Sequence, residues 1–219
     1  MLILGGVEVG KCAFCRVVAC YRGELDKLPS FCPMRHLENV LEKAREEFLT
    51  NEESKKLGAT ASIIEASGYM KWPRLKEIIE YARRLNIKRI GVAFCIGLKT
   101  EANFACQALE NAGFKVFSVC CKVGSINKGD VGLPREYWLS SRDFEAICNP
   151  IGQAMVLNAL KTDLNILIGL CVGHDSLFYR YSKAPVVTLV AKDRVTGHNP
   201  VAVLYSRYYQ RVFGIKPGV

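Results

Sequence analysis

Ten of the 219 residues are cysteine, and four of these cysteines lie close together near the N-terminus. Cys12, Cys15, Cys20 and Cys32 follow the spacing C-x2-C-x4-C-x11-C. Four thiolates on one loop can surround a zinc ion tetrahedrally or hold a [4Fe–4S] cluster. Cys32 is followed by Pro33, as the last cysteine of bacterial ferredoxin motifs is, which slightly favours iron–sulfur. We therefore expect a metal site at these four cysteines, [4Fe–4S] or alternatively zinc.

Four further cysteines stand at the ends of predicted elements. Cys95, Cys121 and Cys171 each close a predicted buried strand, and Cys148 stands before an Asn-Pro pair suited to start a helix. In a parallel sheet the carboxyl ends of strands and the N-termini of helices meet at one edge, where ligands bind and thiolates are stabilised. We expect these four cysteines to face one crevice and to bind a second [4Fe–4S] cluster, with three thiolate ligands and one open iron for redox or Lewis-acid chemistry. The alternative is that they pack as small apolar side chains, as we expect for Cys106 and Cys120.

Polar residues beside these cysteines are candidates for catalysis. We expect Cys171, His174, Asp175 and Lys122 to take part, since they follow the predicted strands directly. His174 could donate a proton or a hydrogen bond to the substrate, or simply bond to the backbone where a helix begins. Lys122 could lower the pKa of the adjacent Cys121 thiol or bind an anionic substrate. The reaction class would then be that of an iron–sulfur lyase or desulfidase, although the sequence does not establish that the protein is an enzyme.

A competing interpretation makes the protein a thiol hydrolase. Residues 169–173 read Gly-Leu-Cys-Val-Gly, which has the form of a nucleophile elbow with Cys171 in place of serine. One of the three histidines would act as the base, and Asp193 would precede His198 as the acid. This interpretation leaves the other cysteines unexplained. A third alternative is a zinc-binding module without catalytic activity.

The periodicity of apolar residues predicts an α/β fold with a small parallel sheet of at least four strands, Rossmann- or flavodoxin-like, covered by helices on both faces. Short continuous apolar runs are typical of strands buried on both faces, and stripes at offsets of three and four indicate amphipathic helices. The predicted strands are residues 89–95, 115–120, 165–170 and 185–191. The predicted helices are residues 36–48, 59–69, 73–85, 100–111, 149–160 and 176–181.

Along the chain we expect three parts: a Cys-rich metal-binding loop at 1–35, a helical segment at 36–87 that packs on the core, and a parallel α/β core at 88–219. A chain of this length can bury a full core without disulfides. With a hydrophobic fraction of 50% and a charged fraction of 23%, it is neither disordered nor a small disulfide-rich toxin.

The remaining composition bears on location and partners. No signal peptide or membrane span is recognisable, so we expect a cytoplasmic protein in which clustered cysteines serve metal binding or catalysis and not disulfides. The formal net charge is +9, with basic residues spread along the chain. That charge permits a nucleic-acid partner without supporting one, and a solvated surface is the simpler explanation. We expect a small-molecule substrate or a redox partner, and the sequence predicts no oligomeric state.

Several segments together resemble a known family, domain-of-unknown-function family 1847. The resemblance extends over nearly the whole chain, and its motifs are specific. They are the N-terminal cysteine spacing with Phe31-Cys32-Pro33, Val119-Cys-Cys-Lys-Val-Gly124, Cys148-Asn-Pro-Ile151, Thr162-Asp-Leu-Asn165, Gly169-Leu-Cys-Val-Gly-His-Asp175, Ala191-Lys-Asp-Arg-Val195 and Gly197-His-Asn-Pro200. Members of that family are described as metal-binding proteins of archaea and bacteria. The resemblance therefore implies a metal and supplies no reaction.

Overall fold

The computed structural model describes residues 3–4 and 6–215, and the chain divides into two compact units, residues 1–63 and 64–219. The division falls within a single helix, α4 (Glu52–Gly68). The Cys-rich loop and the helix that we expected at 36–48 belong to the first unit. The helix that we expected at 73–85 belongs to the second unit, together with the sheet.

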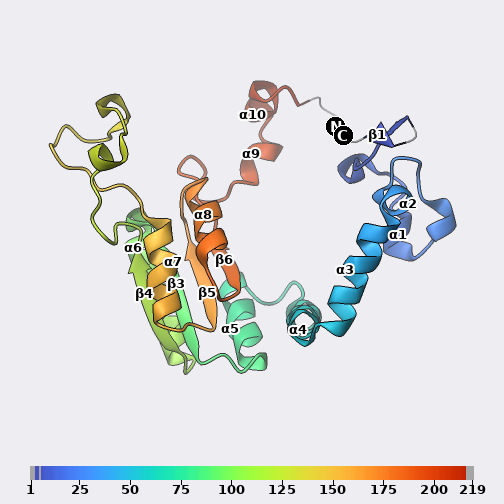
Figure 1. The fold of residues 1–219 in the computed structure, drawn as a ribbon, viewed down its shortest axis with the longest axis horizontal. Helices are drawn as coiled ribbons and strands as arrows, with labels where there is room; N and C mark the ends of the chain where they lie inside the picture. The colour runs from blue at the N-terminus through green and yellow to red at the C-terminus, as the bar shows by residue number, and fades with distance from the viewer. Residues whose placement is uncertain (1–2, 5, 216–219) are drawn as a thin grey trace. The chain divides into compact units, whose positions relative to one another are not determined.

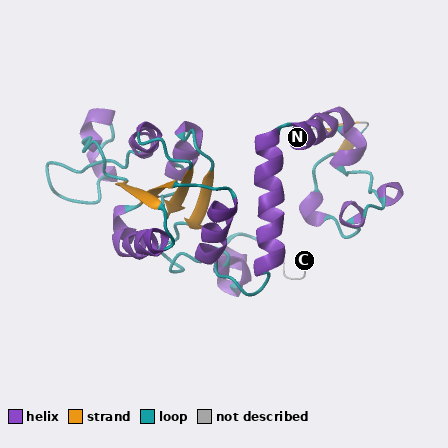
Figure 2. Ribbon diagram, turned by 90° about the horizontal axis from the view of Figure 1, so that it is seen from below, coloured by secondary structure: helices purple, strands orange, loops and turns teal. Residues whose placement is uncertain are grey.

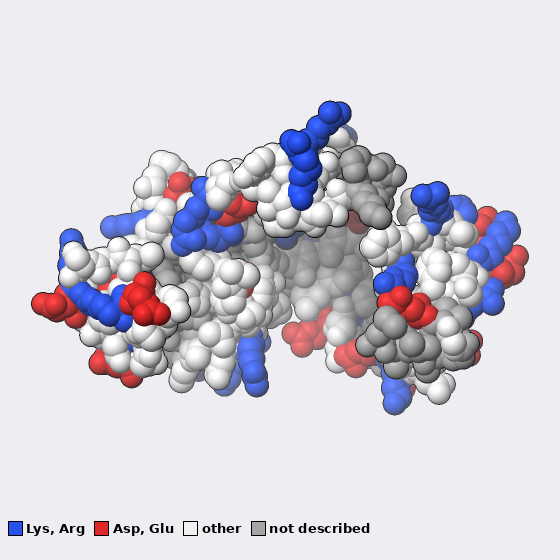
Figure 3. Space-filling model, turned by 90° about the horizontal axis from the view of Figure 1, so that it is seen from above, with Lys and Arg blue, Asp and Glu red and all other residues white. Residues whose placement is uncertain are grey.

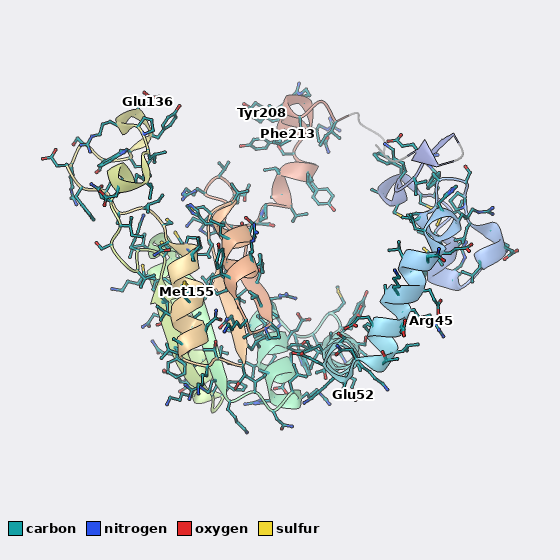
Figure 4. All side chains as sticks on the ribbon, in the orientation of Figure 1. Arg45, Glu52, Glu136, Met155, Tyr208 and Phe213 are labelled. Carbon is teal, nitrogen blue, oxygen red and sulfur yellow. The ribbon has the colours of Figure 1, made fainter. Side chains whose placement is uncertain are left out.

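The first unit is built from short elements with a small core. Its largest helix, α3, has no buried residue, and Arg45, labelled in Figure 4, lies on it. Its apolar core cluster contains Ala19, Leu28 and Cys32, with Met34 packed against them. Asn51 ends α3 and starts α4, because its side-chain oxygen accepts the backbone N–H groups of the first turn of α4. The elements are β1 (Ile3–Leu4), β2 (Val7–Glu8), η1 (Cys12–Phe14), α1 (Ala19–Arg22), η2 (Leu25–Lys27), α2 (Pro33–His36) and α3 (Glu38–Thr50).

The second unit contains a four-stranded parallel sheet, which confirms the predicted α/β fold class (Figure 1). The strands lie in the order β4-β3-β5-β6, and every neighbouring pair is parallel. The sequence of β5, Leu-Asn-Ile-Leu-Ile, is fully buried, as expected for a strand covered on both faces. The strands are β3 (Arg89–Phe94), β4 (Lys115–Cys120), β5 (Leu164–Ile168) and β6 (Val186–Val190).

Helices cover both faces of this sheet, as predicted (Figure 2). Side chains alternate along each strand, so Ile90, Val92 and Phe94 face one core cluster and Ala93 and Cys95 face the other. The first cluster includes residues of α5 and α6, and the second includes residues of α7 and α8. These helices are α5 (Arg74–Arg84), α6 (Lys99–Asn111), α7 (Pro150–Ala159) and α8 (His174–Tyr181).

The strand order places a topological switch point at β3. The chain passes from β3 through α6 to β4 on one side, and then through α7 to β5 on the other side of β3. Helices therefore leave in opposite directions from the carboxyl ends of adjacent strands, which opens a crevice there in doubly wound folds. Cys95 directly follows β3, and Cys121 directly follows β4. β5 ends at Ile168, so Cys171 lies three residues beyond that strand and not at its last position.

The rest of the second unit consists of short helical turns. η3 (Ile96–Leu98) connects β3 to α6, while η4 (Lys128–Val131) and η5 (Arg135–Tyr137) lie in the connection between β4 and α7. α9 (Ala202–Tyr205) and α10 (Arg207–Val212) follow β6. At α10 the rings of Tyr208 and Tyr209 pack edge-to-face, and the rings of Tyr209 and Phe213 are stacked. Figure 4 labels Tyr208 and Phe213.

Two surface properties bear on partners. Within the described residues, every helix is too short or too polar to cross a membrane. On the face seen in Figure 3, the Lys and Arg side chains stand in small separate groups, with Asp and Glu among them.

Candidate functional site

Three of the four predicted cysteines meet at the carboxyl edge of the sheet. The sulfur atoms of Cys121 and Cys148 lie 3.7 Å apart, and Cys95 belongs to the same core cluster, with the N–H of its neighbour Ile96 donating to the Cys121 sulfur at 3.3 Å. Cys121 is 1% exposed and Cys95 is 6% exposed, while Cys148 is half-buried. We call these three residues the thiol triad. Its members come from the end of β3, the end of β4 and the residue before the N-cap of α7.

Backbone hydrogen bonds that continue beyond the strands hold the triad together. The N–H of Cys95 donates to the Ile168 carbonyl at 3.0 Å, and the N–H of Cys121 donates to the Phe94 carbonyl at 2.9 Å. The N–H of Asn149 donates to the Cys121 carbonyl at 2.7 Å, which places Cys148 beside Cys121. The Asn149 side chain also accepts the Gly152 N–H, so it caps α7 as its position predicted.

Gln153 of α7 joins the two strands that Cys95 and Cys121 follow. Its side-chain amide donates to the Phe94 carbonyl at 3.2 Å and to the Val119 carbonyl at 2.7 Å. The residue is fully buried, so these bonds replace those that its amide N–H groups would make to water, while its Oε1 has no hydrogen-bond partner among the described residues. Gln153 thereby bridges the ends of β3 and β4, which the backbone ladder pairs and which Cys95 and Cys121 directly follow.

Three cationic side chains contact the sulfurs of this edge. The Lys122 ammonium lies 3.4 Å from the Cys148 sulfur and also donates to the Ala146 carbonyl. The Lys192 ammonium lies 3.5 Å from the Cys95 sulfur, and an Arg194 guanidinium nitrogen lies 3.1 Å from the Cys171 sulfur. We expected Lys122 to act on Cys121, but its ammonium lies on Cys148 instead.

The outer thiols of the triad favour the thiolate form, while the central one favours the thiol. Hydrogen bonding from Cys121, followed by that from His174 and the charge of Lys122, lowers the pKa of Cys148 to about 4. Hydrogen bonding from Cys121, with help from the Gly97 N–H and Lys192, lowers the pKa of Cys95 to about 5. The pKa of Cys121 is raised, because hydrogen bonding with Cys148 and Cys95 favours its protonated form and because it is buried.

The other predicted catalytic residues occupy different positions around the triad. His174 begins α8 and approaches Cys148, whose hydrogen bond raises the pKa of the imidazole. Its Nδ1 is buried and has no hydrogen-bond partner among the described residues. The Asp175 carboxylate instead accepts the N–H groups of Gly173 and Ser176. Asp175 therefore shapes the start of α8 and does not contact a sulfur.

Cys171 is separate from the triad but belongs to the same charged environment. Its sulfur contacts Arg194, and the charges of Cys171, Cys95 and Cys148 together contribute to raising the pKa of that guanidinium. A thiol hydrolase would instead need a histidine in contact with the sulfur of the nucleophile, Cys171. The His198 Nδ1 accepts the Asp193 N–H, and the Asp193 carboxylate accepts the N–H groups of Val195 and Thr196. Both residues are thus occupied in their own loop.

The four N-terminal cysteines are arranged differently. Cys12 and Cys20 are exposed, Cys32 is buried, and the Cys15 sulfur accepts the Val18 N–H at 3.4 Å. In neither cysteine set do donors enclose a single point: among residues 3–4 and 6–215, no three His, Cys, Asp or Glu side chains are placed to hold a metal ion. Both metal sites remain predictions that rest on residue type and position.

The sequence analysis did not predict three residues that lie at the carboxyl edge: Lys192, Arg194 and Gln153. Lys192 and Arg194 follow β6, so the same argument that placed cysteines after β3 and β4 could have placed them. Cys106 and Cys120, expected as packing residues, do contact the apolar core. Gln153 carries no such signal, because a glutamine inside an amphipathic helix is usually a solvent-facing residue.

Comparison with known proteins identifies relatives without a known function. Residues 32–189 match the model of a family described as proteins of unknown function, DUF1847. An uncharacterized protein of Methanocaldococcus jannaschii is 43% identical over 199 residues, which cover 91% of this chain and 95% of that protein. Neither description names a metal, so the metal implied by the motifs stays a prediction.

Proposed function

The chain belongs to the DUF1847 family of proteins of unknown function, and from its own site we propose that it is a metal-binding protein whose thiol triad holds a metal centre for Lewis-acid or redox chemistry. The observation that carries the proposal is the convergence of Cys95, Cys121 and Cys148 at the switch point of a parallel sheet. Thiolates are preferred ligands of zinc and of iron–sulfur clusters, and this edge is where such folds bind ligands.

The spacing of the sulfurs bears on the kind of centre. Two thiolates bound to one tetrahedral ion at about 2.3 Å lie about 3.8 Å from each other. The Cys121 and Cys148 sulfurs are 3.7 Å apart. The thiolates of a [4Fe–4S] cluster bind different irons and are farther apart, so the separation of this pair fits a single zinc or iron ion better than the cluster that the sequence suggested. The three sulfurs would enclose such an ion only after metal binding rearranges them. Cys95 supplies the third donor, and binding requires Cys121 to lose its proton.

The neighbouring residues suit such a centre. Lys122 and Lys192 offset the negative charge of the outer thiolates, which lowers the cost of gathering three sulfurs in a buried place. A bound ion with a free coordination position would polarise a substrate oxygen or sulfur. His174, beside Cys148, is placed to donate a hydrogen bond to a molecule bound there.

The N-terminal cysteines are proposed as a second metal site, [4Fe–4S] or zinc, on the strength of their spacing alone. A cytoplasmic location is part of the proposal as well. All ten cysteines are free thiols in the structure, and free thiols persist in reducing compartments.

Metal analysis of the anaerobically purified full-length protein tests the proposal. Cys95→Ser, Cys121→Ser and Cys148→Ser should each lose one centre relative to the wild type, while Cys106→Ser and Cys120→Ser should keep it. Cys120→Ser is the closest control, because it alters the neighbour of Cys121. Circular dichroism verifies that each variant is folded, and acid-labile sulfide separates a cluster from a single ion. Unchanged metal content in folded triad variants would contradict the proposal.

A further inference from the structure

One pair of sulfurs in the thiol triad is close enough to form a bond. The Cys121 and Cys148 sulfurs lie 3.7 Å apart, and both residues are free thiols. A disulfide has a sulfur–sulfur length of about 2.05 Å, so closure requires a movement of about 1.7 Å. A change of one side-chain torsion moves a sulfur by more than that distance. Oxidation can therefore join this pair while the strands stay in place.

The loop between these two cysteines is already closed by backbone hydrogen bonds. The Asn149 N–H donates to the Cys121 carbonyl at 2.7 Å, and the Ile147 N–H donates to the Ile126 carbonyl at 2.9 Å. These two donors lie on either side of Cys148 in the chain. Because the entropy of loop closure has been lost on folding, a disulfide forms here with little further ordering of the backbone.

The thiols of the triad differ in their access to solvent. Cys121 is 1% exposed and Cys95 is 6% exposed, while Cys148 is half-buried. A reagent that arrives from solvent therefore meets the Cys148 sulfur first, and Cys121 lies behind it as the second thiol. The half-buried position of Cys148 favours a small reagent over a bulky one.

The groups around Cys148 suit a reaction in which its sulfur is the nucleophile. The Lys122 ammonium lies 3.4 Å from this sulfur and is held there by the Ala146 carbonyl at 2.6 Å. A cation in contact with a cysteine sulfur favours the nucleophilic thiolate. His174 lies beside Cys148, and its Nδ1 is buried without a hydrogen-bond partner among the described residues. Lys122 and His174 can thus stabilise negative charge on an oxygen that leaves from this sulfur.

We propose that this pair of thiols reduces small hydroperoxides, with Cys148 as the nucleophile and Cys121 as the thiol that completes the disulfide. A hydroperoxide is a small electrophile whose leaving group is an oxyanion, which matches the access to Cys148 and the groups around it. The activity lies outside the proposed function and requires no metal.

The reaction balances in two steps. In the first, the Cys148 thiolate attacks one oxygen of the hydroperoxide ROOH, so that an S–O bond forms and the O–O bond breaks. The alkoxide leaves as ROH, taking up the proton that Cys148 released on ionising. In the second step, the Cys121 sulfur attacks the Cys148 sulfenic acid, so that the S–S bond forms and the S–O bond breaks. Hydroxide leaves with the Cys121 proton as water.

An external dithiol returns the two electrons. Its thiolate attacks the accessible Cys148 sulfur, and the Cys121 thiol is released. The second thiol of the reductant then displaces Cys148, and the reductant ends as a disulfide. Peroxide and dithiol are the two substrates of the cycle.

Peroxide consumption and peptide mapping by mass spectrometry test the inference on the full-length protein, reduced with dithiothreitol that is then removed. One equivalent of hydrogen peroxide should join Cys121 to Cys148, and fresh dithiothreitol should restore both thiols. With dithiothreitol in excess, peroxide consumption should continue over many turnovers. Trypsin places Cys148 in the peptide 143–161 and places Cys121 together with Cys120 in the peptide 116–122.

Matched cysteine variants assign the two roles. Cys120→Ser changes the neighbour of Cys121 in the same peptide and should keep the disulfide and the wild-type rate. Cys121→Ser should still react but stop at the Cys148 sulfenic acid, which dimedone traps. Cys148→Ser should lose the disulfide and the rapid consumption of peroxide. Circular dichroism verifies that each variant is folded.

Matched lysine variants test the cation. Lys122→Met should slow the oxidation of Cys148 about tenfold, which corresponds to the loss of one charge-assisted hydrogen bond. Lys183 is exposed and precedes β6, at the opposite edge of the sheet, so Lys183→Met should change the rate less than about twofold.

Three results would overturn the inference. One is consumption of peroxide by Cys148→Ser at the wild-type rate, and another is a disulfide that joins a different pair, such as Cys95 and Cys121. The third is oxidation of Cys106 in the wild type as fast as that of Cys148, since an ordinary thiol would then suffice.

Discussion

The two cysteine sets of this protein differ in their spacing along the chain and in how closely their side chains are packed. Cys12, Cys15, Cys20 and Cys32 lie within one short loop region, yet two of them are exposed and only Cys32 is buried. The thiol triad draws its members from positions 95, 121 and 148, yet they share one core cluster, the Cys121 and Cys148 sulfurs lie 3.7 Å apart, and lysines contact the sulfurs of Cys95 and Cys148.

This difference shows what each kind of site depends on. A loop site depends on the metal itself to order its ligands, because little else fixes the side chains. A site at a sheet edge is positioned by the strands, the helix caps and Gln153 before any ligand arrives. We therefore expect the two sites to respond separately to substitution.

The largest effect should come from removing the N-terminal set. Replacing Cys12, Cys15, Cys20 and Cys32 by serine should remove one entire metal centre and leave the triad centre at its wild-type amount. Metal and sulfide analysis of the purified variant, set against Cys121→Ser, measures both centres. Loss of both centres from the N-terminal variant would show that the two sites are not independent.

The second effect concerns the reactivity of Cys148 in the metal-free protein. Its pKa of about 4 lies below that of an ordinary thiol, so the thiolate should persist as the pH falls from 9 and be lost only near pH 4. Alkylation by iodoacetamide, followed on the Cys148 peptide by mass spectrometry, should show this profile.

Two substitutions should move that profile to higher pH. Cys121→Ala removes the strongest stabiliser of the thiolate and should have the greater effect, and Lys122→Met should have a smaller one. Cys106, whose pKa is raised by burial, serves as the internal comparison in the same digest. A Cys148 profile that matches an ordinary thiol would show that Cys121 does not stabilise the Cys148 thiolate.

The smallest effect is on stability and tests how tightly the sheet packs against α7. A Cβ atom at Gly91 would lie 2.1 Å from the buried Asn165 side-chain oxygen and 2.9 Å from Leu157. Gly91→Ala should therefore lower the free energy of unfolding by about 1–3 kcal/mol. Gly129→Ala, whose Cβ would make ordinary contacts, should change it by less than about 0.5 kcal/mol. Chemical denaturation measures both variants, and equal stability of the two would contradict the packing argument.

Much of the fold could be predicted because its pattern is local. Continuous apolar runs identified the four strands, and amphipathic stripes identified α3, α5 and α6 to within about two residues at each end. Cys171 was misplaced relative to the end of β5, since the apolar residues 169 and 170 extend the run after the strand has ended. An apolar run identifies burial, whereas the end of a strand is set by its hydrogen bonds.

The sequence by itself determined the α/β class, the parallel sheet and the edge at which its cysteines stand. These follow from local periodicity and from the rule that parallel strands end at the same edge. The tertiary structure alone decided that Lys122 contacts Cys148 and not Cys121, that Cys171 pairs with Arg194, and that Gln153 joins β3 to β4. Such contacts depend on strand order and on the direction of individual side chains, which arise only when distant segments pack together.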